Sequence, residues 1–352
     1  MQFPLTQGNL TPIKKCSNIL TNPKVLMDFT LEFERPVSEL ENQIRELRET
    51  SHQSIDITHE IEALQAKVNR MLEEIYHKLS PWERTQLSRH PARPHAIDYI
   101  EKLVTDFHEV HGDRRFSDDP SMITGFGYLE GEKVAVIGIE KGRKTQEKIK
   151  RNFGMANPEG YRKALRIMQL ASQFKIPVIT FVDTPGAYPG IGAEERGQAL
   201  AIAENLEEMF KIKSPIISVV IGEGGSGGAL GIAVADKVFM MEYSVYSVIS
   251  PESCASILWS DPKMAETAAN SLQLSPNKAL ELKVIDGIIK EPAGGAHRHP
   301  EKALSMVKDA ILASLESLKK EEIESVLERR FEKFRQMGNL TLTIDNTDEA
   351  RG

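Results

Sequence analysis

Residues 215–236 read PIISVVIGEGGSGGALGIAVAD, and this stretch decides the fold. It opens with the β-branched, apolar run 216–221, which is typical of a strand buried on both faces. Residues 222–228 then contain five glycines, and an apolar helix is expected from Ala229 onward. Glycine permits positive φ and lets a ligand approach bare backbone N–H groups, and a helix start adds unpaired donors. We therefore expect a strand, a turn and a helix that form a pocket for an oxyanion or a phosphate.

Two familiar motifs match this turn. Gly222, Gly224 and Gly227 fit the dinucleotide-binding pattern G-x-G-x-x-G, and Glu242 follows at about the distance expected of a ribose-binding acid. Gly224, Ser226 and Gly228 also fit the G-x-S-x-G nucleophile elbow. In that interpretation the remaining triad members, in hydrolase order, are Asp286 followed by His297 or His299.

Two further interpretations need no side-chain chemistry. The turn could be an oxyanion hole built from backbone N–H groups without a nucleophile. It could also be a tight strand-to-helix connection that binds nothing. These residues alone leave all four interpretations open.

Composition narrows the class of protein. The chain has 352 residues, of which 40% are hydrophobic and 27% charged, which is ordinary for a globular protein. Its formal net charge of −7 argues against general nucleic-acid binding. Cys16 and Cys254 lie too far apart in the sequence to suggest a disulfide framework or a cysteine-based zinc site, so we expect a reducing compartment and a cytoplasmic protein. No apolar run approaches the ~20 residues that a membrane helix needs.

The chain divides into four predicted parts. Residues 1–30 read as a disordered extension or a weak targeting segment, and residues 31–79 as a helical hairpin. Residues 80–318 form the main body, and residues 319–352 a C-terminal helix with a polar tail. The hairpin is predicted from apolar stripes at helical spacing, at Val37, Leu40, Ile44 and Leu47 and at Ile61, Leu64, Val68, Met71 and Ile75. It either packs on itself or serves as an arm for a second subunit, and we favour the arm.

Within the body, helical and extended patterns alternate. Ile100, Leu103, Val104 and Phe107 predict a helix, with His108 and His111 as a surface pair rather than a metal site. Further along we expect a hairpin of strands over 124–129 and 134–139, a helix over 159–174, strands over 178–182, 246–249 and 284–289, and helices over 300–318 and 320–336.

The strand over 178–182 ends in a second glycine-rich loop, residues 183–192, DTPGAYPGIG. Strand, glycine loop and helix thus occur twice, about 40 residues apart. The beginning of this loop imitates the D-x-x-G of a GTPase, but G-x-x-x-x-G-K-[ST] is absent, which argues against nucleotide hydrolysis.

A basic run lies upstream of both loops. It consists of Lys141, Arg143, Lys144, Lys148, Lys150 and Arg151, against only Glu140 and Glu147. The run is either a solvated helix face or an electrostatic landing site for an anionic substrate or an acidic partner.

Several long blocks resemble the α subunit family of the acetyl-coenzyme A carboxylase carboxyltransferases of bacteria and plastids. They are EKIKRNFGMANPEGYRKALRIMQLA (147–171), ITFVDTPGAYPGIGAEERGQ (179–198), VIGEGGSGGAL (220–230), YSVISPESCASILW (246–259) and GGAHRHP (294–300). The similarity spans residues 31–335. It implies an α/β crotonase-like (ClpP/crotonase) fold of repeated ββα units, preceded by the N-terminal helical hairpin.

The resemblance also implies an activity. This family transfers a carboxyl group from carboxybiotin to acetyl-CoA and gives malonyl-CoA, the first committed step of fatty acid biosynthesis. Carried over to this sequence, the N–H groups of Gly227 and Gly228 would form the oxyanion hole for carboxybiotin. Gly224, Gly225, Gly186, Ala187, Lys148 and Arg151 are the expected substrate-binding residues. A ureido anion that itself takes the methyl proton would make a protein base unnecessary.

Partners follow from the same resemblance. The biotin is expected on a separate biotin carboxyl carrier protein, and biotin carboxylase completes the full complex. A β subunit with a Cys₄ zinc ribbon would hold the acetyl-CoA enolate in an α2β2 assembly, so no metal is expected in this chain. The compartment would be the cytoplasm, or the plastid stroma in a plastid-bearing source.

Overall fold

The computed structural model describes residues 29–50 and 57–338. Apart from Phe29 and Thr30, the predicted extension over residues 1–30 lies outside the described residues, and so does the polar tail after residue 338.

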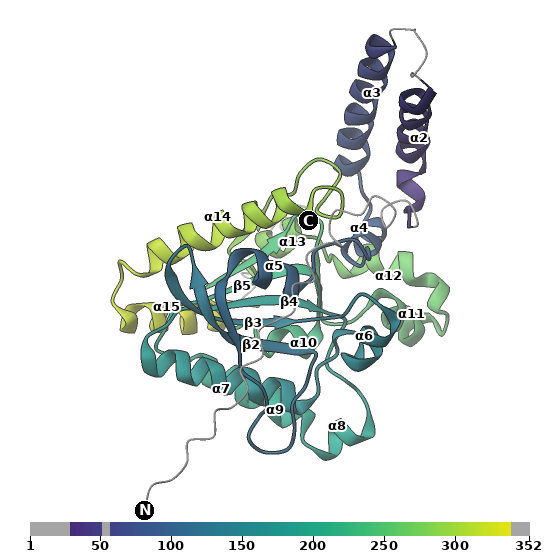
Figure 1. Cartoon of the computed structure of the whole chain (residues 1–352). Helices are drawn as coiled ribbons and strands as arrows, with labels where there is room; N and C mark the ends of the chain where they lie inside the picture. Colours follow the sequence, from purple (N-terminus) through teal and green to yellow (C-terminus); the bar gives the residue numbers. More distant parts are fainter. Residues whose placement is uncertain (1–28, 51–56, 339–352) are drawn as a thin grey trace, which may run out of the picture.

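Within this part of the chain, one eight-stranded sheet forms the centre of the molecule (Figure 1). Its strands are β1 (Thr105–Glu109), β2 (Met122–Leu129), β3 (Glu132–Ile139), β4 (Val178–Thr184), β5 (Ile216–Gly225), β6 (Lys237–Met241), β7 (Val245–Ser247) and β8 (Gly287–Ile289). The order across the sheet is β1-β2-β3-β4-β5-β6-β8, and β7 pairs with the carboxyl end of β5. β1, β2 and β3 are antiparallel, whereas β3 to β8 run parallel.

Strand order excludes the dinucleotide-binding interpretation. From β3 onward, successive parallel strands are added in one direction across the sheet. A Rossmann sheet reverses its strand order near the first strand, and the ligand binds at that reversal. The described sheet has no such reversal, so the prediction made from Gly222, Gly224 and Gly227 was wrong. Glu242, its expected ribose-binding acid, instead accepts hydrogen bonds from Lys290 Nζ and the Glu291 N–H.

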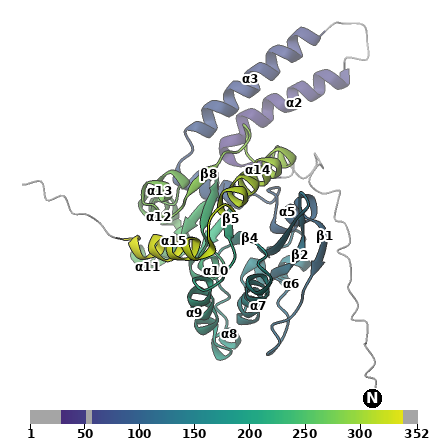
Figure 2. The ribbon, with the colours of Figure 1, turned by 90° about the vertical axis from the view of Figure 1, so that its left-hand side faces the viewer.

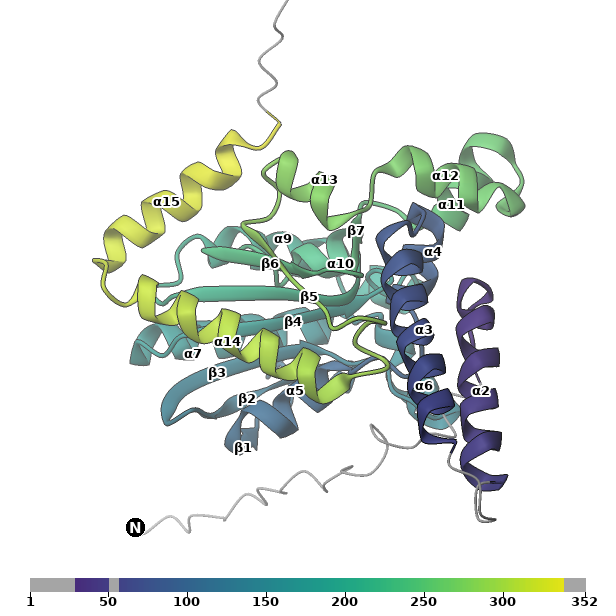
Figure 3. The ribbon, with the colours of Figure 1, turned by 90° about the horizontal axis from the view of Figure 1, so that it is seen from above.

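Helices cover both faces of the sheet. The helices of the described residues, not all of which contact the sheet, are α2 (Arg35–Thr50), α3 (Thr58–His77), α4 (Pro81–Ser88), α5 (Ala96–Leu103), α6 (Thr145–Lys150), α7 (Pro158–Phe174), α8 (Ile191–Glu195), α9 (Gln198–Met209), α10 (Ser226–Leu230), α11 (Pro251–Trp259), α12 (Ala265–Leu272), α13 (Pro276–Glu281), α14 (Pro300–Leu318) and α15 (Ile323–Gln336), with short 3₁₀ turns η1 (Glu32–Glu34), η2 (Asn152–Gly154) and η3 (Pro262–Met264). α7, α9 and α10 bury apolar side chains against one face, and α5 and α14 against the other. Figure 3 looks down on α14 as it lies across the strands. This burial on two sides explains why β4 and β5 are buried along their whole lengths.

The helical hairpin is formed by α2 and α3, which project together from the body (Figure 2). Val37, Ile44 and Val68 are buried between the two helices, as the apolar stripes predict. At the base of the hairpin, Tyr76 packs against Tyr243 of the body, with ring centroids 5.2 Å apart. The pair therefore packs on itself and on the body, and its role as a subunit arm stays a prediction.

The helix predicted through Phe107 was wrong in its second half. α5 ends at Leu103, and Phe107 and His108 lie in β1, so the two predicted histidines do not share a helix face. The reason lies in the neighbouring strand. A Cβ at Gly125 would lie 2.6 Å from the Phe107 ring, and one at Gly127 would lie 2.5 Å from Val104. These glycines of β2 leave room for the side chains of β1, and sheet pairing outweighs the local helical spacing.

The remaining differences between prediction and structure concern the ends of strands and helices. The strands expected over 246–249 and 284–289 are the shorter β7 and β8, and the helix expected from residue 320 begins at Ile323. This last helix is fastened to the body by Arg330, whose guanidinium is fully buried against Asp236, with the shortest contact 2.6 Å. The same side chain also donates to the Met209, Ile212 and Ser214 carbonyls.

Candidate active site

The turn between β5 and α10 has an unusual backbone. Ser226, the first residue of α10, has φ of +51°, a conformation uncommon for residues other than glycine and often kept at functional sites. Gly227 and Gly228 follow in the first helical turn, where backbone N–H groups have no carbonyl partner within their own helix. Ser226 and Gly227 are half-buried and Gly228 is buried. The turn therefore presents backbone donors at the edge of the core.

The second glycine loop lies directly against this turn. A Cβ at Gly225 would lie 2.2 Å from the Pro185 carbonyl oxygen, and one at Gly228 would lie 2.4 Å from the Gly186 carbonyl carbon and 2.5 Å from the Ala187 nitrogen. The two loops can approach this closely only because both positions lack a side chain. The structure therefore brings together Gly225, Gly228, Gly186 and Ala187, four of the expected site residues, and their roles toward a substrate stay a prediction.

Gly227 and Gly224 have different surroundings. A Cβ at Gly227 would meet only the Ile202 side chain, at 3.6 Å, so this glycine faces more open space. A Cβ at Gly224 would lie 2.8 Å from the Tyr246 ring of β7, so its missing side chain is explained by packing. At Gly186, where φ is +153°, a Cβ would have nothing within 4 Å. Bare backbone is therefore accessible at Gly186 and Gly227, on either side of the contact between the loops.

Two buried side chains hold α10 in place. The Tyr161 hydroxyl of α7 donates to the Gly228 carbonyl at 3.3 Å, and its ring fills the space beside Gly231. Asn205 of α9 donates to the Tyr161 and Gly231 carbonyls at 3.0 and 2.9 Å. Burial raises the pKa of Tyr161, so its hydroxyl remains a donor at neutral pH. Neither residue was predicted: Tyr161 lies in the block 147–171 but had no role assigned to it, and Asn205 lies outside the quoted blocks.

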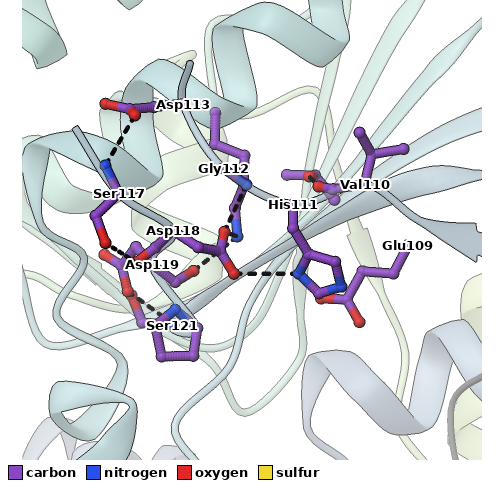
Figure 4. Close-up of polar contacts among 12 residues, drawn as sticks. Glu109, Val110, His111, Gly112, Asp113, Ser117, Asp118, Asp119 and Ser121 are labelled. Carbon is purple, nitrogen blue, oxygen red and sulfur yellow. Dashed lines mark hydrogen bonds and ion pairs between the residues drawn. The ribbon is translucent and has the colours of Figure 1, made fainter. Parts of the chain in front are cut away.

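The loop between β1 and β2, whose internal polar contacts Figure 4 shows, also binds α7. Asp118 accepts hydrogen bonds from His111 and the Gly112 N–H within the loop, and from the fully buried Lys163 of α7 at 2.6 Å. Asp113 caps the backbone N–H groups of residues 115–117 and also binds Arg162 of α7. We interpret this network of satisfied polar groups as support for α7 and thus for Tyr161.

The basic run does not act as one surface. Lys141 and Arg143 turn inward to form ion pairs with Asp183 and Asp98. Arg151 donates to the Pro120 carbonyl, whereas Lys148 and Lys150 lie on α6 with no ion pair among the described residues. The run is joined to the second glycine loop by the Lys141–Asp183 pair, and just beyond the run Thr184 Oγ1 donates to the Gly154 carbonyl at 2.7 Å.

A buried charge cluster lies at the roots of both glycine loops. Lys141 Nζ is 2.7 Å from Asp183 Oδ1 and 3.4 Å from Glu223 Oε2, and the Glu223 N–H donates to the same Asp183 oxygen at 2.9 Å. Arg89 binds the other Glu223 oxygen at 2.7 Å. Burial alone would raise the pKa of Glu223, but the charges of Lys141 and Arg89 outweigh it, and the pKa lies below its ordinary value. Glu223 therefore stays ionised, and the cluster joins the strand ends from which the two loops start.

A second polar cluster joins the hairpin to the body. Glu34 Oε1 accepts from Tyr76 at 2.6 Å and from His297 Nε2 and Arg298 Nε, both at 3.1 Å. Glu34, His90 and His297 place their ligand atoms within 4.8 Å of one another beside a cavity of about 740 Å³. Such a set could hold a metal ion, but the Arg298 cation already binds the same carboxylate oxygen.

The histidines of this cluster are engaged as well. His90 Nδ1 accepts from the Ala92 N–H, so Nε2 carries the proton and donates to the Phe29 carbonyl at 3.1 Å. Burial lowers the pKa of His90 to about 3 and also lowers that of His297, so both rings are neutral at pH 7. We interpret the cluster as a joint that fastens the hairpin, a role that explains the GGAHRHP segment.

These contacts exclude the serine hydrolase interpretation. Asp286 accepts from the Val238 N–H and from Lys333 Nζ, whereas His297 binds Glu34 and His299 lines the cavity beside it. Among the described residues, no hydrogen bond links Ser226 to a histidine. The predicted triad was therefore wrong, since its members are separated by other partners.

The sequence is similar to those of known proteins over most of its length. The model of the family described as acetyl co-enzyme A carboxylase carboxyltransferase-like matches residues 30–338. The acetyl-coenzyme A carboxylase carboxyl transferase subunit alpha of Hydrogenovibrio crunogenus is 53% identical over 313 residues, 89% of this chain and 98% of the relative. The subunit alpha of Thermus thermophilus is 52% identical over 309 residues, 88% of this chain and 98% of the relative. The chain belongs to this carboxyltransferase family.

A solved structure supports the fold of this carboxyltransferase family member. A Pseudomonas malonate decarboxylase hetero-tetramer in complex with coenzyme A aligns with a TM-score of 0.50 at 15% identity, covering 62% of this chain and 86% of that chain. The predicted crotonase-like fold is thereby confirmed. Within residues 29–50 and 57–338, no helix has the length and apolar character needed to cross a bilayer.

Proposed function

We propose that this chain is the α subunit of a biotin-dependent acetyl-CoA carboxyltransferase, acting in fatty acid biosynthesis. The observation that carries the proposal is the close contact between the two glycine loops beside the half-buried start of α10. Membership of the family supplies the reaction: a carboxyl group is transferred from carboxybiotin, held on a carrier protein, to acetyl-CoA.

The site fits carboxybiotin through backbone rather than side chains. Carboxybiotin, when bound, supplies the carboxyl group, and negative charge develops on its ureido oxygen as that group leaves. The N–H groups of Gly227 and Gly228 lie in the first turn of a helix, the position where the helix dipole favours negative charge. They would donate to that oxygen, and such preorganised donors lower the barrier without reorganisation. Gly186, Ala187 and Gly225 would form the opposite wall.

A second subunit is expected to complete the site. Val248, Ile257 and Leu258 are 75%, 71% and 63% exposed, and the last two lie on α11. This apolar face adjoins the site, because β7 pairs with β5 at residues 223–225 and leads into α11. Exposed apolar patches of this kind mark protein interfaces. We propose that the β subunit covers it in an α2β2 assembly and supplies the acetyl-CoA half.

Reconstitution tests the proposal as a whole. Malonyl-CoA formation from carboxybiotin and acetyl-CoA should be undetectable with the purified chain and should appear when a β subunit is added. The physical reason is that this chain supplies one oxyanion hole, whereas the reaction needs one for each substrate. Turnover by a demonstrably pure chain, or none with the partner bound, would contradict the proposal.

A pair of substitutions separates backbone from side-chain chemistry. In the reconstituted enzyme, Ser226→Ala should change kcat only a few-fold, whereas Gly227→Val should lower it by ~10²–10³, the size of effect that losing one oxyanion donor has. The backbone N–H remains in the variant, but the valine side chain would keep the ligand from reaching it. Valine at position 227 would place its methyl groups in the open space where the ligand must approach. Thermal unfolding and subunit association, measured for both variants, control for folding. An acyl-enzyme trapped on Ser226 would show instead that the serine is a nucleophile.

Lys148 and Lys150 lead to a prediction about how an anionic substrate or carrier protein associates with the enzyme. We propose that Lys148 and Lys150 attract an anionic substrate or carrier protein toward the site, with Arg151 next to them on the loop side. Replacing both lysines by Gln should raise the apparent KM for acetyl-CoA or carrier protein, and the difference from wild type should shrink as salt screens the charges. Arg151 is left unchanged, because its bond to Pro120 would also be lost.

The matched control is the double change of Lys175 and Lys213 to Gln. Both lysines are exposed, have no ion pair among the described residues and precede β4 and β5, at the strand ends opposite the glycine loops. Equal KM values for wild type and the Lys148/Lys150 variant at every salt concentration would mean that these lysines form a solvated face.

A further inference from the structure

Arg89 occupies a position between the site and the apolar face. It follows the last residue of α4, and its side chain reaches two carboxylates from different elements. Nε and Nη2 donate to Glu223 Oε1 at 2.9 and 2.7 Å, and Nη1 donates to Glu252 Oε1 at 2.6 Å. Glu223 immediately precedes the glycines of the β5–α10 turn, whereas Glu252 lies in the first turn of α11.

We propose that Arg89 is a positioning residue that couples docking of the partner subunit on α11 to the conformation of the glycine turn. The inference rests on the proposed function, because that function makes α11 part of an interface. It goes further by naming the chemical link through which an interface could act on the oxyanion hole.

The charges favour a positioning role over ligand binding. Around Glu223, the cations Arg89 and Lys141 face the carboxylates of Glu223, Asp183 and Glu252. Carboxylates outnumber cations by one in this set, so it would not attract an anionic substrate. Each guanidinium nitrogen of Arg89 already has a carboxylate partner, and such a fork fixes geometry as well as charge.

Solvent exposure increases along the chain of ion pairs from Glu223 through Arg89 to Glu252. The Glu223 side chain is 9% exposed, that of Arg89 29% and that of Glu252 40%. The inner end of the link is thus already shielded from water, while the outer end lies on α11. Helical spacing puts Glu252 on the side of Trp259, which is 41% exposed, and not on that of Ile257 and Leu258, so the inference requires the partner to cover this face of α11 as well. Covering that face removes water from the Arg89–Glu252 pair, and an ion pair strengthens as the local dielectric falls. Docking therefore tightens the hold on Arg89, and through Glu223 on the start of the glycine turn.

The test measures the glycine turn directly as well as turnover. Amide hydrogen exchange of residues 222–230 is followed in the free chain and in the chain saturated with β subunit, for wild type, Glu252→Gln, Arg89→Lys and Arg89→Met. We expect partner binding to slow exchange in wild type by about 10-fold, and this protection to be lost in Arg89→Met, strongly reduced in Glu252→Gln and partly kept in Arg89→Lys. In the saturated complex, kcat should fall by about 10- to 100-fold for Glu252→Gln, with the KM for acetyl-CoA unchanged, because a small displacement of catalytic groups has that effect.

Two controls distinguish coupling from general damage. Glu281→Gln breaks the exposed Lys278–Glu281 pair on α13 and should leave exchange and kcat at wild-type values. In an Arg89→Met background, Glu252→Gln should have no further effect, since the link is already broken. Wild-type protection that persists in Glu252→Gln, or effects of the two changes that simply add, would overturn the inference. Protection of the turn in a wild-type complex that forms no malonyl-CoA would instead uphold the link and reject the proposed function.

Discussion

The structure depends on one close approach of backbone to backbone, where Gly225 and Gly228 meet the loop of Pro185, Gly186 and Ala187. Any side chain at the two glycines would lie 2.2–2.5 Å from atoms of that loop. The contact holds the carboxyl ends of β4 and β5 together and fixes the first turn of α10 beside them. A site made of main-chain N–H donors depends on this contact. Such donors move only with the backbone, so no change of side-chain rotamer can restore a ligand contact once the loops shift.

The rest of the molecule supports that contact from behind. Tyr161 and Asn205 fix α10 from α7 and α9, and the loop of Asp113 and Asp118 holds α7 in turn. On the strand side, Lys141 forms ion pairs with the buried carboxylates of Asp183 and Glu223 at the two loop roots. Removing one partner of such a buried cluster leaves an uncompensated charge, which is strongly destabilising. Polar groups thus hold the β5–α10 turn rigid, while apolar packing of helices on both faces of the sheet stabilises the body of the protein.

Sequence reasoning succeeded where the signal is local. The apolar run of β5 and the stripes of the hairpin each predict one element without help from the rest of the chain. The glycines after the run were interpreted less well, because β5 continues to Gly225 and the helix expected from Ala229 onward begins at Ser226 and ends at Leu230. Sequence reasoning failed where distant residues decide: Phe107 lies in a strand because Gly125 makes room for it, and the predicted triad was wrong because Glu34 binds His297 across 263 positions. Arg89 was missed for the same reason, since its partner Glu223 is 134 residues away. The hydrophobic pattern alone did not decide the fold. The crotonase-like fold was predicted from the long blocks shared with the carboxyltransferase family.

The central claim is that backbone N–H groups of Gly227 and Gly228, and no nucleophile, receive the charge that develops on biotin. A structure of the assembled subunits with biotin bound tests this most directly. The account predicts that the ureido oxygen lies 2.7–3.1 Å from both glycine nitrogens, the range of a working oxyanion hole. A ureido oxygen that contacts a side chain instead, or lies beyond hydrogen-bond reach of the turn, would contradict it.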